Sequence, residues 1–287
     1  MKLCETFKTN PCVFSIECFP PKKAESYPNM QATLRKMAAL EPDFISVTYG
    51  AGGSAGGVST VEIASFLKRE LGVEPLAHFV CMGSSEERMS ADLAALAANG
   101  VHNVLALRGD ATPLRPVSPH FAHASDLAAF IRYKQPGFGI SGACYPEGHP
   151  ESASLAADLE GLRRKADAGC DHFITQLFFD NYRYYRFLNR ARKAGLSLPV
   201  SAGVMPIVKK SQIERTVALS AASLPAEFTR MIARYQDDEQ ALFDAGIDYA
   251  IRQLRDLIEG GADGVHLYAM NNVEVAERIC DGIRDLL

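Results

Sequence analysis

Residues 86–110, EERMSADLAALAANGVHNVLALRGD, hold the pattern that decides the fold. The amphipathic run near 86–98, rich in alanine, leucine and charged residues, is typical of a surface helix. Gly100 follows where a helix needs a left-handed residue to end, and the apolar run at 102–107 is typical of a strand. A glycine stands in the same position before three later strands, at Gly169, Gly195 and Gly261.

This alternation of strand and helix runs along the whole chain. The pattern predicts strands near 12–18, 43–48, 75–80, 102–107, 138–144, 171–176, 198–204 and 263–268. It predicts helices near 29–39, 58–71, 86–98, 123–134, 152–168, 181–194, 209–220 and 271–286, and an extra helical block near 225–259. Ser84 and Glu87 are interpreted as a capping box at the start of the third helix.

Eight strand-then-helix units predict parallel strands joined by right-handed crossovers. Such units close into a (β/α)8 TIM barrel, here with an extra helical insertion before the last strand. A doubly wound open sheet is the alternative, but the strand count favours the barrel. We expect one catalytic barrel domain over residues 1–287.

Composition narrows the class of protein. Apolar residues make up 47% of the 287 and charged residues 22%, which is typical of a globular protein. A net charge of −4 argues against binding to nucleic acid through phosphate neutralisation. No apolar run approaches membrane-spanning length, and the start MKLCETFKTN lacks an apolar signal core, so no membrane contact is expected. Seven scattered cysteines without CxxC spacing favour a reducing, cytoplasmic location and no cysteine zinc site.

Polar residues gather where the predicted strands end. In a barrel, catalytic groups lie at the carboxyl ends of the strands, so these residues should share one mouth. From the first strand to the last they are Glu17, Thr48, Tyr49, His78, Arg108, Gly109, Asp110, Tyr145, Gln176, His266 and Tyr268.

Glu17 is the most informative of these residues. Val13, Ser15 and Glu17 share one face of the first strand, and the more apolar face should meet the helices, which turns Glu17 into the barrel. Burial favours the protonated form of a carboxylate there, so Glu17 could serve as a general acid near neutral pH. A structural ion pair inside the barrel is the alternative from the pattern alone.

Two further clusters suggest an anionic ligand. Arg108 could hold an anion beside Gly109, which permits close approach of a backbone, while Asp110 could accept from the NH groups of a heterocycle. Taken alone, that motif is better explained as a surface turn with a local ion pair. The helix near 152–168 places Asp158, Gly161, Arg164 and Lys165 on one arc, where two cations beside a residue without a side chain could seat phosphates, or simply form a solvated face.

The histidines do not form a metal-binding motif. His78 and His266 could act as ligands with Glu17 or Asp110, as in a metal-dependent barrel lyase. No HExxH spacing occurs, and a histidine satisfied within the core is the commoner arrangement, so we predict no metal site.

Five motifs in order resemble the methylenetetrahydrofolate reductase family, and the match runs along nearly the whole chain. They are SIECFPPK at 15–22, SVTYGAGGS at 46–54, ALRGD at 106–110, YPEGHPES at 145–152 and ITQLFFD at 174–180. The resemblance implies a flavoprotein in which FAD takes hydride from NADH or NADPH and passes it, in a ping-pong reaction, to 5,10-methylenetetrahydrofolate. The product is 5-methyltetrahydrofolate, as in one-carbon metabolism and methionine biosynthesis.

The resemblance also assigns residues to roles. Glu17 matches the acid that protonates N10 of the folate, and Asp110 matches a carboxylate near the pterin and the flavin. Gln176 and Tyr268 are assigned to substrate. Those assigned to FAD are Thr48, Tyr49, Ala51, His78, Arg108, Gly109, Asp110, His123, Ala124, Tyr145, His149, Asp158, Arg164 and Lys165.

Three positions depart from the family pattern. His123 stands where a tyrosine is common, Lys210 where an aromatic residue often stacks on ligands, and Asn272 where some members have arginine. Because of Lys210 and Asn272, the sequence does not fix the folate and nicotinamide contacts. The choice of electron donor is left open for the same reason. Family habit suggests a homo-oligomer, and a folate-binding barrel without turnover is a further alternative.

Overall fold

Eight parallel strands close into a barrel in the computed structural model, which describes residues 1–49, 57–110, 120–213, 216 and 222–287. Each strand pairs with the next in sequence, and β8 pairs back with β1. The TIM barrel expected from the sequence is confirmed, and the open doubly wound sheet is wrong. The strands are β1 (Val13–Cys18), β2 (Phe44–Val47), β3 (Glu74–Val80), β4 (Asn103–Leu107), β5 (Gly139–Cys144), β6 (His172–Thr175), β7 (Val200–Val204) and β8 (Gly264–Leu267).

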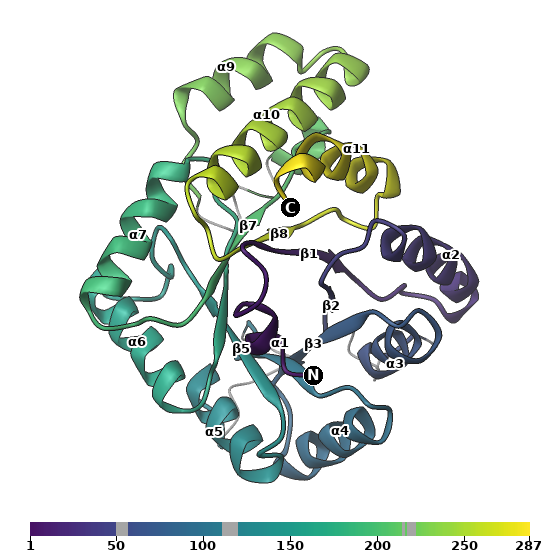
Figure 1. Cartoon of the computed structure of the whole chain (residues 1–287), viewed down its shortest axis with the longest axis vertical. Helices are drawn as coiled ribbons and strands as arrows, with labels where there is room; N and C mark the ends of the chain where they lie inside the picture. The colour runs from purple at the N-terminus through teal and green to yellow at the C-terminus, as the bar shows by residue number, and fades with distance from the viewer. Residues whose placement is uncertain (50–56, 111–119, 214–215, 217–221) are drawn as a thin grey trace.

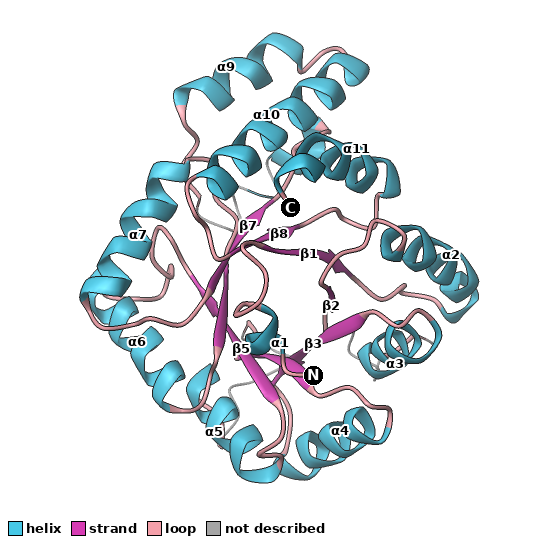
Figure 2. Cartoon of the chain, in the orientation of Figure 1, coloured by secondary structure: helices cyan, strands magenta, loops and turns pink. Residues whose placement is uncertain are grey.

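Helices surround the strands, as Figures 1 and 2 show. The predicted helical insertion before β8 is confirmed, as α9 and α10, whereas the helix predicted at 209–220 lies partly outside the described residues. No helix in the described ranges is both long and apolar enough to cross a membrane. The helices are α1 (Leu3–Thr6), η1 (Ala24–Ser26), α2 (Tyr27–Ala38), α3 (Thr60–Glu70), α4 (Glu86–Ala98), α5 (Ala124–Lys134), α6 (Leu155–Asp167), α7 (Asn181–Lys193), α9 (Ala226–Tyr235), α10 (Glu239–Glu259), α11 (Val273–Ile283) and η2 (Arg284–Leu286).

The ends of α4 show how closely local sequence sets a helix. Gly100 has φ +76°, the left-handed conformation expected of it just past the C-cap. The predicted capping box of Ser84 and Glu87 is wrong by one residue. Ser85 has the extended backbone that an N-cap needs, and its hydroxyl accepts a hydrogen bond from the Arg88 N–H at 3.3 Å. The third position of the helix is therefore Arg88. Its side chain has no acceptor for the Ser85 N–H, so no reciprocal capping box can form.

Side chains of β1 point alternately outward, toward the helices, and inward, into the barrel. Phe14, Ile16 and Cys18 join the large core between the barrel and the helices. Val13 joins a smaller cluster inside the barrel, and Ser15 and Glu17 contact the interior histidines. The period of two along a strand produces this division, and it confirms that Glu17 turns into the barrel.

The short helix α1, which the sequence pattern did not predict, lies against the amino-terminal end of the barrel. Leu3 is 2% exposed and packs inside with Val13 of β1, and its N–H donates to Asn103 Oδ1 at 3.0 Å. The Phe7 ring, just after α1, lies 4.5 Å from the His172 ring, centroid to centroid. This end of the barrel is thus filled by apolar packing, and the polar mouth lies at the opposite end.

The insertion packs beyond the ends of β6 and β7. Phe228 of α9 stacks on Phe179, which follows β6, with ring centroids 4.4 Å apart. From α10, the Tyr249 hydroxyl donates to the Phe179 carbonyl oxygen at 2.6 Å. Gly246 of α10 meets the backbone of Ile207 so closely that no Cβ fits between them. The insertion therefore supports the loops on one side of the mouth.

Candidate active site

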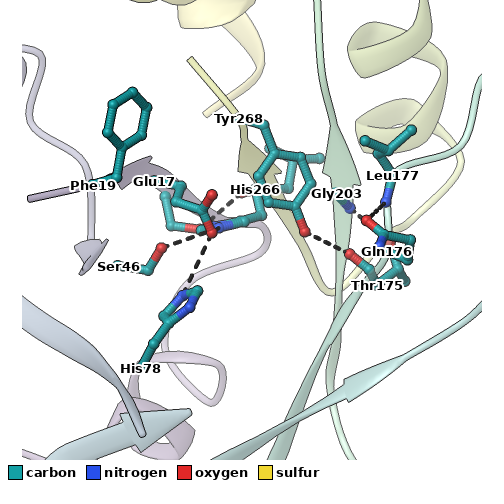
Figure 3. A network of polar contacts seen from close by, with 12 residues as sticks. Glu17, Phe19, Ser46, His78, Thr175, Gln176, Leu177, Gly203, His266 and Tyr268 are labelled. Atoms are coloured by element: carbon teal, nitrogen blue, oxygen red, sulfur yellow. Dashed lines mark hydrogen bonds and ion pairs between the residues drawn. The ribbon is translucent and has the colours of Figure 1, made fainter. Parts of the chain in front are cut away.

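Glu17 lies at the centre of a polar network at the carboxyl end of the barrel (Figure 3). Its side chain is 17% exposed, and Oε2 lies 3.4 Å from His78 Nε2 and 3.9 Å from His266 Nε2. The carboxylate thus faces two imidazoles from β3 and β8, on opposite flanks of β1 and β2. A carboxyl group held in this way is sheltered from bulk water yet remains reachable from the mouth.

His266 is held rigidly beneath Glu17. Its side chain is fully buried, with Nδ1 2.7 Å from Ser15 Oγ and Nε2 3.3 Å from Ser46 Oγ. Ser15 and Ser46 come from β1 and β2, so the bridge ties three neighbouring strands together at the level of the site. A second bridge of the same kind, with His172 between Ser141 and Ser201, lies across the barrel.

His78 differs from His266 because one of its ring nitrogens is left without a partner. Nε2 is buried and makes no hydrogen bond to any described residue, since its contact with Glu17 lacks hydrogen-bond geometry. Burial lowers the pKa of His78 to about 4, although the Glu17 carboxylate acts in the opposite direction. His78 is therefore neutral near pH 7, and its free nitrogen is available to a bound ligand.

Tyr268, which directly follows β8, lies against Thr175 of β6 and Gly203 of β7 at the mouth. Its hydroxyl donates to the Thr175 carbonyl oxygen at 2.7 Å, and burial raises its pKa well above the usual value. The ring fits only because residue 203 is glycine, since a Cβ at that position would lie 2.5 Å from the Thr175 oxygen and 2.6 Å from the ring. Gln176 is the first residue after β6, and its Oε1 accepts a hydrogen bond from the Leu177 N–H at 2.9 Å. Sequence reasoning found Tyr268 and Gln176 but missed Gly203 and Thr175; a glycine inside an apolar strand was the available signal.

Arg108 stands at the end of β4 and reaches across the rim. Its Nη1 lies 2.7 Å from Glu151 Oε2, in the loop after β5, and this hydrogen-bonded carboxylate raises the pKa of Arg108. Gly109 has φ +85°, and a Cβ there would lie 2.5 Å from Val80 Cγ1, so the position requires glycine. Asp110 follows and is exposed. The motif therefore places a cation and a carboxylate on either side of a glycine that packs against Val80.

The α6 cluster separates into two parts. Asp158 lies in the first turn, where its Oδ1 accepts from the Ser152 hydroxyl at 3.2 Å. Arg164 and Lys165 lie in the last turn. Arg164 is exposed, whereas Lys165 turns inward and its Nζ donates to the Ala143 carbonyl oxygen at 2.7 Å. Burial lowers the pKa of Lys165.

The part of the chain that the structure describes contains no assembled set of metal ligands. No group of three histidine, cysteine, aspartate or glutamate side chains there is placed to hold a metal ion. Asp110 does not join Glu17, His78 and His266. The ligand set of the metal-dependent lyase alternative is therefore not brought together among these residues.

The family profile described as methylenetetrahydrofolate reductase matches residues 2–284. The chain belongs to the methylenetetrahydrofolate reductase family. It is 32% identical over 266 residues to the 5,10-methylenetetrahydrofolate reductase of Escherichia coli, covering 93% of this chain and 88% of that protein. It is 35% identical over 273 residues to the probable methylenetetrahydrofolate reductase (NADH) of rice, covering 90% of this chain and 46% of that protein. The chain thus spans about half the length of the plant relative.

Solved structures show the same fold at lower identity. A protein from Clostridium thermocellum, described as binding two copies of 5-methyl-5,6,7,8-tetrahydrofolic acid, superposes with a TM-score of 0.72 at 14% identity. The match covers 99% of both chains. Tryptophan synthase of Mycobacterium tuberculosis superposes with a TM-score of 0.58 at 13% identity, covering 98% of this chain and 97% of that one. These likenesses show the fold.

The residues assigned to FAD lie on strands, loops and helices between β2 and α6 in this member of the methylenetetrahydrofolate reductase family. Ala51 falls outside the described residues. The other assigned positions run from the end of β2 through β3 and β4 to β5, with the starts of α5 and α6 and the last turn of α6. They are Thr48, Tyr49, His78, Arg108, Gly109, Asp110, His123, Ala124, Tyr145, His149, Asp158, Arg164 and Lys165.

Two of the three departures from the family pattern, Lys210 and Asn272, have local structural uses. The Asn272 side chain caps α11 by accepting from the Val275 N–H at 3.2 Å. Lys210 is 60% exposed, and its Nζ lies 3.7 Å from Asp237 Oδ1 on the insertion. Neither side chain takes part in the polar contacts around Glu17.

Proposed function

We propose that the protein reduces 5,10-methylenetetrahydrofolate to 5-methyltetrahydrofolate, with FAD as cofactor and NADH or NADPH as hydride donor, in a ping-pong reaction. The observation that carries this proposal is the Glu17 carboxyl group, held at the mouth of the barrel between His78 and His266. Membership of the reductase family supports the reaction, and the position of Glu17 supports its role as the acid.

The residues at the mouth fit a flavin. A heterocycle with several hydrogen-bonding groups would use the free Nε2 of His78, which is costly to bury without a partner. Arg108 and the amino-terminal ends of α5 and α6 would favour the diphosphate. When bound, FAD would supply the hydride chemistry, and the protein would orient it and tune its charge.

The chain's own groups would manage the proton. Reduction of the methylene unit requires ring opening, which protonation at N10 of the folate assists. Glu17 would donate that proton, because its carboxyl group lies at the mouth of the barrel between His78 and His266. His266, fixed by its bridge, would help to hold the carboxyl group 3.9 Å away, and Asp110 would stabilise positive charge that develops on the folate.

The test is to replace Glu17 by glutamine in the FAD-loaded protein. Glu17→Gln should retain bound FAD and its reduction by NADH or NADPH, which absorbance reports, yet lose folate reduction by about 100-fold or more, the usual contribution of a general acid. Glu70→Gln is the control, because Glu70 is exposed at the carboxyl end of α3, which leads into the start of β3 at the end of the barrel opposite the mouth.

Each outcome has a clear reading. Wild-type folate reduction by Glu17→Gln would remove the acid assignment. A wild-type protein that binds folate but whose flavin no donor reduces would favour the binding-only barrel, an alternative that the Clostridium thermocellum neighbour's description supports. Activity that a chelator abolishes and that needs no flavin would favour the metal-dependent lyase.

A further inference from the structure

The seam between β1 and β8 opens before it reaches the mouth. The two strands pair from Val13 to Ile16 on β1, where the last partner is Leu267. Tyr268, the next residue, is not in register with β1, and its N–H donates to the Val204 carbonyl oxygen of β7 at 2.9 Å. The end of β1 therefore has no ladder partner on its β8 side just where it carries the site.

The Asn271 side chain closes this gap. Its Oδ1 accepts from the Phe19 N–H at 3.1 Å, and its Nδ2 donates to the Phe19 carbonyl oxygen at 2.9 Å. One carboxamide thus makes both hydrogen bonds that a neighbouring strand would make to a single residue. The Nδ2 group also contacts Met30 Sδ of α2 at 3.5 Å. We name this pair of bonds between Asn271 and Phe19 the clasp.

The backbone that presents the clasp is strained. Met270 and Asn271 both have left-handed φ values, +55° and +57°, in a tight turn closed by the Asn272 N–H and the Ala269 carbonyl oxygen at 2.9 Å. Asparagine tolerates this conformation, but methionine pays a free-energy cost to adopt it. Such outliers cluster at functional sites, because surrounding structure must hold them in place.

The clasp holds an aromatic residue that has no apolar partner cluster. Phe19 is partly exposed, lies beside Glu17 at the end of β1 (Figure 3), and belongs to none of the apolar clusters formed by the described residues. A partly exposed phenylalanine ring, two residues along the chain from a candidate acid and outside the apolar clusters of the described residues, is suited to pack against a planar ligand. Such a ring, on a strand end that lacks a partner on its β8 side, is held in place better when its main chain is fixed.

We propose that Asn271 is a positioning residue for folate: through the clasp it fixes Phe19, whose ring packs against the planar ring system of the substrate beside Glu17. The inference rests on the proposed function and deepens it. Asn271 acts through Phe19 and does not itself need to touch the ligand. Its loss and the loss of the Phe19 ring should therefore have the same effect on folate binding.

The test measures equilibrium binding of 5-methyltetrahydrofolate to the FAD-loaded protein by calorimetry. Asn271→Gly removes the carboxamide but keeps a residue suited to left-handed φ, so the variant should fold. We expect Asn271→Gly and Phe19→Leu each to raise the Kd about 2- to 10-fold, the range for loss of one aromatic contact. The double variant should bind no more weakly than Phe19→Leu. Met270→Gly, which relieves the turn without touching the clasp, should leave the Kd unchanged.

The outcomes separate this inference from the proposed function. Unchanged folate binding by Asn271→Gly, even with a lowered melting temperature, would show a purely structural clasp and overturn the inference. Independent effects that multiply in the double variant would also overturn it, because residues acting through one contact are not additive. A wild-type protein that does not bind 5-methyltetrahydrofolate at all would overturn the proposed function together with it.

Discussion

Replacing Gly203 by alanine tests how tightly the mouth of the barrel is built. Gly203 lies on β7, between the Thr175 carbonyl oxygen of β6 and the Tyr268 ring. A Cβ there would lie 2.5 Å from that oxygen and 2.6 Å from the ring carbon Cε2. Both distances are about 1 Å shorter than an ordinary contact. The methyl group of alanine cannot be accommodated unless the strands or the ring move.

The magnitude follows from what can move. The Thr175 oxygen belongs to the backbone of a paired strand, so it cannot yield by a rotamer change. Tyr268 could swing away only by losing its 2.7 Å hydrogen bond to that same oxygen. Overpacking of this kind costs about 1–3 kcal/mol of unfolding free energy. For a chain of this size, such a loss lowers the melting temperature by about 2–5 °C.

Thermal unfolding followed by circular dichroism measures the effect. Gly137→Ala is the matched control, because nothing lies within 4 Å of a Cβ at Gly137 and its φ is not left-handed. That variant should melt at or slightly above the wild-type temperature, since alanine restricts the unfolded chain. Folate affinity of Gly203→Ala should also fall if Tyr268 contacts substrate.

A Gly203→Ala protein that melts with the wild type and the Gly137→Ala control would refute the reasoning. It would mean that the Tyr268 ring has space to turn and that its bond to Thr175 does not hold it in place. The ring could then not serve as a fixed wall of the mouth.

Two further predictions concern charge. Burial lowers the pKa of His172 to about 3, below its ordinary value of about 6.5. Between pH 6.5 and 3 the unfolded chain therefore binds a proton at His172 that the folded chain does not. The stability that neutral His172 gives the folded state is full above pH 6.5 and is lost as the pH falls. His172→Asn should therefore show a smaller fall in unfolding free energy between pH 6.5 and 4 than the wild type in urea titrations, and an equal fall would contradict this. Asp110→Asn should raise the flavin midpoint potential, because a nearby negative charge disfavours reduction; a redox titration without any shift would place Asp110 away from the flavin.

Local pattern was enough for much of the fold and for part of the site. Alternation along residues 13–18 turned Glu17 into the barrel, and polar residues at the strand ends marked the mouth. Gly100 ended α4 as expected, because the left-handed conformation is a local requirement. The capping box failed by one residue because two consecutive serines offer the same chemistry, and only the backbone path chooses between them.

Contacts between distant segments were decided only by the closed barrel. Glu17 contacts His78 and His266, and Asn271 forms the clasp with Phe19. The partners lie far apart in the sequence, and their positions along the chain do not predict that they meet. The sequence by itself determined the alternating units and the side to which each strand residue points, because both follow from the period of a strand and the chemistry of a turn. Tertiary structure alone determined which side chains touch, because closure of the barrel sets the register between strands.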